Sequence, residues 1–243
     1  FKKNKINIIR KNWLVKSINL KKQFCYSKIN KNNNNNKVNP YMFVLELSKI
    51  LNKNSIIIGD TGSHLTWLMQ SFKIKYGQML FSAFGNSPMG YALPASIGAQ
   101  IINKKKKIVS LNGDGSIQLN IQELQTLKKL KLPIKIIIFN NNGYGIIKQF
   151  QDLYLNKRHE ASDRIVSNPN FKILSKGYGI NYHLIRNNKN LSKLKKIIKS
   201  NKSEIIEVNI EDNEKIVPKL EFGKPIDDLS PKIDLEKIAK YLS

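Results

Sequence analysis

Cysteine is nearly absent from this sequence of 243 residues. The single Cys25 excludes an internal disulfide framework. No apolar run approaches the about 20 residues that a membrane-spanning helix needs, so we expect no membrane partner. The first residues are basic and lack the apolar core of a secretion signal. We therefore expect a cytoplasmic protein, with import into an organelle as the alternative that a basic start leaves open.

Acidic residues are also few. The sequence has 17 Asp and Glu against 42 Lys and Arg, which gives a formal net charge of +25. Such an excess suggests a nucleic-acid-binding protein. However, the lysines are spread along the whole chain among many Asn and Ile residues, and there is no zinc or helix-turn-helix pattern. We interpret the lysines as a solvated surface that helps to draw in anionic ligands, and we expect no nucleic acid partner.

Two polar triplets each follow an apolar segment. Gly113-Asp114-Gly115 follows the apolar segment 107–111, and the asparagines 140–142 follow the segment 134–139. Between the triplets, apolar residues recur with helical spacing at positions 117, 121, 124, 127 and 130, and Pro133 closes the connection. The pattern predicts a β-α-β unit, with a helix over 117–130 and two parallel strands that are neighbours or nearly so.

Strands and helices alternate along most of the chain. The expected helices span 12–20, 41–51, 63–72, 89–100, 171–176, 191–199 and 235–242. The expected strands span 55–59, 79–83, 182–185 and 204–208. This alternation predicts an α/β fold, with a doubly wound, mostly parallel sheet and helices on both faces.

The sequence divides into three parts. Residues 1–37 form a lead-in that contains the asparagine run 32–36, which has no apolar pattern and should be a loop. Residues 38–215 form the compact domain, and residues 216–243 form a tail with several prolines. The sequence begins with Phe1 and not with Met, which favours a piece of a longer chain.

Asp114 and Asn141 should emerge at the same carboxyl edge of the sheet, because they follow two parallel strands. Magnesium prefers six oxygen ligands and takes few of them from protein. The Asp114 carboxylate, the Asn141 amide oxygen and the Gly143 carbonyl suit that need, beside glycines that let a diphosphate approach the main chain. The plainer reading is that Asp114 only shapes a turn.

The two triplets, at this spacing, resemble the binding motif of thiamine diphosphate-dependent enzymes. The flanking residues 113–126 and 132–144 are similar to the acetolactate synthase-like branch, and the similarity extends to 60–67, 89–99 and 145–151. It covers roughly residues 38–230. The resemblance implies a thiamine diphosphate-binding fold, the carboxyl-terminal domain of such an enzyme.

The resemblance also implies a set of site residues. Asp114, Asn141 and the carbonyl of Gly143 match the magnesium ligands, and Met89 matches the residue that supports the thiazolium ring. Met89 as a core filler and His64 as a packed side chain are the plainer readings. The residues that match cofactor-binding positions are Thr61, Gly62, Ser63, His64, Ser87, Met89, Gly113, Asp114, Gly115, Ser116, Asn141, Gly143, Tyr144 and Gly145.

The implied activity is that of a transferase or lyase of branched-chain amino acid biosynthesis. Such an enzyme decarboxylates a pyruvate-like 2-oxo acid and joins the two-carbon unit to a second carbonyl. The glutamate that activates the cofactor belongs to the family's amino-terminal domain, which no part of this sequence resembles. The resemblance therefore implies no catalytic residue within this chain, and a homodimer or a partner chain that supplies that domain. The resemblance is compatible with FAD in the full-length enzyme.

Two departures from the family pattern leave alternatives open. Phe150 stands where acetolactate synthases that prefer a larger second substrate carry tryptophan, so we place it in the substrate pocket with the acceptor undecided. Asn86-Ser87-Pro88 replaces a glycine-rich segment, and the tail resembles relatives found with surface-polysaccharide genes. The alternatives are a 2-oxo acid decarboxylase, a polysaccharide-associated thiamine diphosphate enzyme, and a truncated chain that only binds cofactor and assembles.

Overall fold

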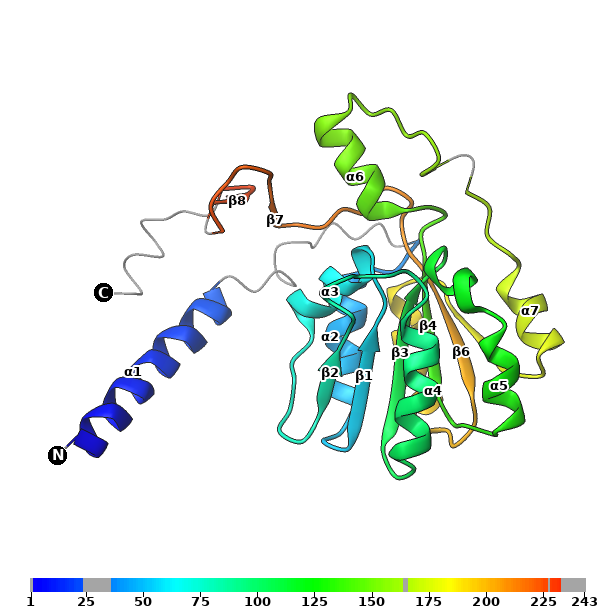
Figure 1. Ribbon diagram of the computed structural model, residues 1–243, viewed down its shortest axis with the longest axis horizontal. Coiled ribbons are helices and arrows are strands. Elements are labelled where there is room, and N and C mark those ends of the chain that lie inside the picture. Colours follow the sequence, from blue (N-terminus) through cyan, green and yellow to red (C-terminus); the bar gives the residue numbers. More distant parts are fainter. Residues whose placement is uncertain (1, 24–35, 164–165, 227, 233–243) are drawn as a thin grey trace. The chain divides into compact units, whose positions relative to one another are not determined.

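The computed structural model describes residues 2–23, 36–163, 166–226 and 228–232 (Figure 1). The chain divides into two units, one of residues 32–216 and one of residues 1–31 with 217–243. The three-part division expected from the sequence stays a prediction. The expected helix at 235–242 and most of the asparagine run lie outside the described residues.

The smaller unit contains helix α1 (Lys2–Gln23), which extends beyond the expected range 12–20 at both ends. It also contains a short antiparallel pair, β7 (Lys219–Leu220) and β8 (Leu229–Ser230). None of the described helices combines the length and the apolar character that crossing a membrane requires.

The larger unit is built on a sheet of six strands in the order β2-β1-β3-β4-β6-β5, and every pair is parallel. The strands are β1 (Ser55–Gly59), β2 (Met79–Phe81), β3 (Lys107–Gly113), β4 (Lys135–Asn140), β5 (Asn181–Ile185) and β6 (Glu204–Asn209). Strand β3 pairs directly with β4, with Gly113 opposite Phe139. The doubly wound sheet and the parallel neighbours of the β-α-β unit are therefore confirmed.

Helices cover both faces of this sheet (Figure 1). They are α2 (Pro40–Ile50), α3 (Ser63–Ser71), α4 (Ala92–Ile102), α5 (Glu123–Lys129), α7 (Phe171–Gly177) and α8 (Leu194–Lys199), with 3₁₀ helices η2 (Ser116–Asn120) and η3 (Asn188–Lys193). A further helix, α6 (Gly145–Tyr154), lies beyond the carboxyl ends of the strands (Figure 1). Helix α6 is not among those that apolar periodicity predicts. Its buried side chains include Lys148, Gln149 and Gln151, so a search for an apolar inner face misses it.

The prediction of a single helix over 117–130 is wrong. The segment begins as the 3₁₀ helix η2 and becomes α-helical only at Glu123. An apolar residue every three or four positions fits either kind of helix. The side chain of Gln118 donates to the Asp114 carbonyl at 3.1 Å and so ties this first turn to the end of β3. The helix expected from Met89 likewise begins later, at Ala92.

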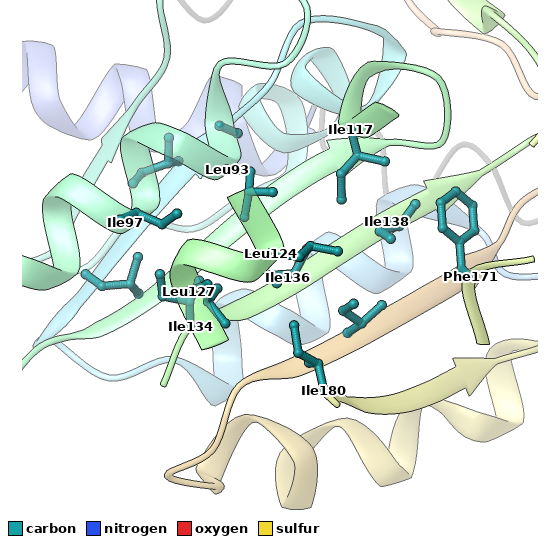
Figure 2. Packing of buried hydrophobic residues seen from close by; sticks show 14 of the residues in the cluster. Leu93, Ile97, Ile117, Leu124, Leu127, Ile134, Ile136, Ile138, Phe171 and Ile180 are labelled. Carbon is teal, nitrogen blue, oxygen red and sulfur yellow. The ribbon is translucent and has the colours of Figure 1, made fainter. Parts of the chain in front are cut away.

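Isoleucines alternate between the two faces of the central strands. Ile136 and Ile138 of β4 pack with Leu124 and Leu127 of α5 on one face, as Figure 2 shows. On the opposite face Phe139 packs against Phe43 of α2 and Trp67 of α3, with ring centroids 5.3 and 6.0 Å apart. Since both faces are covered, the strands are apolar throughout, and the sheet edge is where polar groups can gather.

Candidate functional site

One cavity of about 300 Å³ lies where β1, β3 and β4 end. All 14 residues that the sequence matches to cofactor-binding positions line it. The structure adds Trp67, Phe139, Ile146 and Ile147 to the lining. Trp67 lies one helical turn beyond His64, and the two isoleucines follow Gly145 directly, so a local signal existed for each.

The Asp114 carboxylate is the charged group of this cavity. The residue is 2% exposed and directly follows β3. Its Oδ1 accepts from the Gly115 N–H at 2.9 Å, and its Oδ2 accepts from the Gly143 N–H at 3.3 Å and from Asn168 Nδ2 at 2.8 Å. Burial raises the pKa of the carboxyl above its usual range, and these hydrogen bonds oppose the rise. The ends of β3 and β4 therefore meet at this carboxylate, as the sequence predicts.

Four buried polar atoms around the cavity have no hydrogen-bond partner among the described residues. They are Ser63 Oγ, His64 Nε2, Trp67 Nε1 and Asn141 Nδ2. Buried polar groups are almost always paired in folded proteins. Their gathering at one cavity indicates a place where a polar ligand would satisfy them.

Glycines allow side chains of the lining to pack directly against the main chain. A Cβ at Gly113 would lie 3.0 Å from the ring of His64, and a Cβ at Gly145 would lie 2.7 Å from Asn141 Nδ2. Neither position takes a side chain without displacing a residue of the lining. Glycine at these positions is what lets His64 and Asn141 lie against the main chain, and the unpaired polar atoms of the lining are the groups that fit a diphosphate.

A metal ion at this edge would need oxygen ligands of mixed type. Within the described part of the chain, no three His, Cys, Asp or Glu side chains come together in a way that could hold a metal. Asp114 would therefore act with an amide oxygen and a main-chain oxygen, and Asn141 and Gly143 line the same cavity. A hard cation such as Mg²⁺ accepts that donor set.

The segment before α4 forms another part of the lining. Thr61 Oγ1 and Ser87 Oγ lie 2.5 Å apart, and Ser87 has a positive φ of 45°, which is uncommon for a residue other than glycine. Met89 is half-buried and lines the cavity, so it is not part of the buried core.

Phe150 does not line this cavity. It lies on α6, where its ring packs against Tyr154 with centroids 4.9 Å apart. Its place in a substrate pocket stays a prediction.

His64 is a neutral histidine. It is 5% exposed, its ring stacks on Phe139 at 6.4 Å, and burial lowers the pKa of its imidazole from 6.5 to about 3. The contact of its ring with Phe139 agrees with the simpler interpretation, that His64 is a packed side chain. Its Nε2 is nevertheless an unpaired atom of the cavity lining.

We expect His64 to make the fold sensitive to acid. The unfolded chain takes up a proton near pH 6.5 and the folded chain only near pH 3, so the stability is fully present above pH 6.5 and falls as the pH drops below it. Between pH 7 and pH 5 the loss amounts to about 2 kcal/mol. Urea unfolding of the wild type and of His64→Gln at both pH values measures the difference. Equal pH dependence of the two proteins would refute the assignment.

Comparison with known proteins places the same residues in a family. The pattern described as "Thiamine pyrophosphate enzyme, C-terminal TPP binding domain" matches residues 60–208. The acetolactate synthase large subunit of Porphyra purpurea is 34% identical over 182 residues, 74% of this chain and 31% of the relative. That of Cyanidium caldarium is 35% identical over 186 residues, which cover 76% of this chain and 32% of the relative. That of Lactococcus lactis is 30% identical over 195 residues, which cover 80% of this chain and 34% of the relative. The chain spans about a third of the length of these curated relatives.

Proposed function

Because the chain belongs to the thiamine pyrophosphate enzyme family, with the C-terminal TPP binding domain of the acetolactate synthase-like branch, we propose that its cavity holds thiamine diphosphate together with Mg²⁺. The observation that carries the proposal is the convergence of all 14 matched residues on one cavity. Most of them follow the ends of β1, β3 and β4, which lie up to about 80 residues apart in the sequence, and Ser87 and Met89 come from the segment before α4.

In this proposal the protein supplies binding and orientation. Asp114, Asn141 and the Gly143 carbonyl would hold the metal, and the main-chain groups around Gly113 and Gly115 would bind the diphosphate. Met89 supports the ring of the cofactor. The bound cofactor supplies the electron sink for the decarboxylation of a 2-oxo acid. Neutral His64 can hydrogen-bond to the ligand through Nε2 without adding a charge at physiological pH.

The proposed reaction is the decarboxylation of a pyruvate-like 2-oxo acid and transfer of the two-carbon unit to a second carbonyl. Ile146 and Ile147, which are 38% and 48% exposed, give the cavity an apolar border. Such a border suits contact with a second domain, which would bring the activating carboxylate from a second copy or a partner chain.

Calorimetric titration tests the proposed function. We expect the chain to bind thiamine diphosphate at millimolar concentration when Mg²⁺ is present, and to lose that binding when EDTA removes the metal. Thiamine without its diphosphate is the matched control and should not bind, because the metal and the glycine-lined main chain recognise the phosphates. Absence of Mg²⁺-dependent binding, or equal binding of thiamine, would overturn the proposal.

Product analysis tests the proposed reaction separately. The assembly that includes the amino-terminal domain is incubated with pyruvate, thiamine diphosphate and Mg²⁺. We expect acetolactate as the product. Release of acetaldehyde alone would leave the cofactor site standing and replace the transferase by a simple decarboxylase.

A further inference from the structure

Asn168 lies beside the carboxylate of Asp114, although 54 residues separate the two in the sequence. Its Nδ2 donates to Asp114 Oδ2 at 2.8 Å and to Asn140 Oδ1 at 3.2 Å, and its Oδ1 accepts from Gln118 Nε2 at 3.2 Å. An amide side chain has two N–H groups and one carbonyl oxygen, and here each finds a partner. The orientation of this amide is therefore determined by its surroundings.

The partners of Asn168 are themselves held in place. Asn140 Nδ2 donates to Glu207 Oε1 at 2.7 Å, and Glu207 Oε2 accepts from the Tyr182 hydroxyl at 2.6 Å. This chain of hydrogen bonds crosses β4, β6 and β5, the strands that are rigidly paired in the sheet. A connected polar network of this kind fixes the position of its members.

The contact of Asn168 with Asp114 differs in kind from the others. Among the described residues, Asn168 provides the one side chain that donates to this carboxylate, since the other donors are the main-chain N–H groups of Gly115, Asn141 and Gly143. Those N–H groups move with the turns that carry them. Asn168 comes from a separate segment just before α7 and can restrain rotation of the carboxylate independently of those turns.

We propose that Asn168 is a positioning residue, which holds Oδ2 of Asp114 so that the carboxylate keeps a single orientation toward a divalent cation. The inference rests on the proposed function, because it concerns the metal that would accompany the diphosphate. Asn168 itself does not line the cavity and is not given a ligand role. Loss of such an outer partner of a metal ligand typically costs 10- to 100-fold in metal affinity.

The test is Asn168→Ala, measured with Mn²⁺ as a spectroscopic substitute for Mg²⁺ at saturating thiamine diphosphate. We expect Mn²⁺ affinity, from electron paramagnetic resonance, to fall about 10-fold or more. The spectrum of the remaining bound Mn²⁺ should broaden, because the carboxylate is no longer restrained. A role that only ties the segment down would leave that spectrum unchanged.

Asn170→Ala is the matched control. Asn170 lies two residues away, is exposed, and caps α7 by accepting from the Ile173 N–H at 3.1 Å without touching Asp114. We expect it to lower the melting temperature and to leave Mn²⁺ affinity and spectrum unchanged. An equal loss of affinity in both variants would reduce Asn168 to a structural tether and overturn the proposal.

Gln118→Met is the substitute variant for the Mn²⁺ measurement if Asn168→Ala does not fold. It removes one of the three anchors of the Asn168 amide together with the contact to the Asp114 carbonyl, and it leaves the bond from Asn168 to Asp114 in place, so we expect a smaller loss of Mn²⁺ affinity in the same direction. Wild-type affinity in whichever variant folds overturns the positioning role while leaving the proposed function intact. Failure of the wild type to bind Mn²⁺ with thiamine diphosphate would instead overturn the proposed function and this inference with it.

Discussion

Asp114→Asn is expected to abolish Mg²⁺-dependent binding of thiamine diphosphate. The substitution keeps the shape of the side chain and removes its charge, so the divalent cation loses its one anionic protein ligand. We expect affinity to fall by more than the about 100-fold that loss of an outer partner can cost. Calorimetry with Mg²⁺ and thiamine diphosphate measures the loss, and circular dichroism checks that the fold is retained.

Asp212→Asn is the matched control for Asp114. Its carboxylate accepts from Asn142 Nδ2 at 3.2 Å and so lies near the same turn, but it does not line the cavity. Removal of this charge should change the affinity by no more than a few fold, because the side chain is 48% exposed and solvent screens it. Undiminished binding by Asp114→Asn would refute the metal assignment, and an equal loss in both variants would show a general effect of charge.

The sheet edge that carries this site could be predicted because its signals are local. The apolar segments before Gly113 and Asn140 are strands whose both faces are buried, and a short helical connection between them requires parallel pairing. Side chains that follow two such strands must then lie near one another. The position of Asp114 beside the turn of Asn141 and Gly143 follows from these facts alone.

The contacts that complete the site could not be predicted, because they join distant segments. Nothing near Asn168 in the sequence indicates that it reaches Asp114, and a polar segment with a proline reads as a loop. The later start of α4 has a similar origin. Gly90 adopts a positive φ of 86°. The N–H groups of Gly90 and Ala92 donate to the carboxylate of Asp60, about 30 residues earlier in the sequence. Apolar periodicity contains no information about such a cap.

Asp60→Ala is expected to be strongly destabilising. Asp60 is fully buried after β1, and its carboxylate accepts from the N–H groups of Thr61 at 2.8 Å, Gly90 at 3.1 Å and Ala92 at 3.1 Å. Alanine leaves these donors without an acceptor, at about 1–3 kcal/mol for each that stays buried. Burial raises the pKa of the Asp60 carboxyl, so removing a costly charge offsets part of the loss. We expect the free energy of unfolding to fall by about 3 kcal/mol in urea titrations at pH 7.

Asp60→Asn separates the loss of the acceptor from the loss of charge. It retains one acceptor oxygen but turns an amide toward at least one main-chain N–H, so its unfolding free energy should lie between those of the wild type and Asp60→Ala. Glu46→Gln, which removes an exposed ion pair with Lys49 on α2, should cost less than about 1 kcal/mol. Because Gly90 adjoins Met89 of the cavity lining, Asp60→Ala should also weaken thiamine diphosphate binding. An Asp60→Ala protein as stable as Glu46→Gln would mean that water replaces the carboxylate, and that the cap does not hold the start of α4.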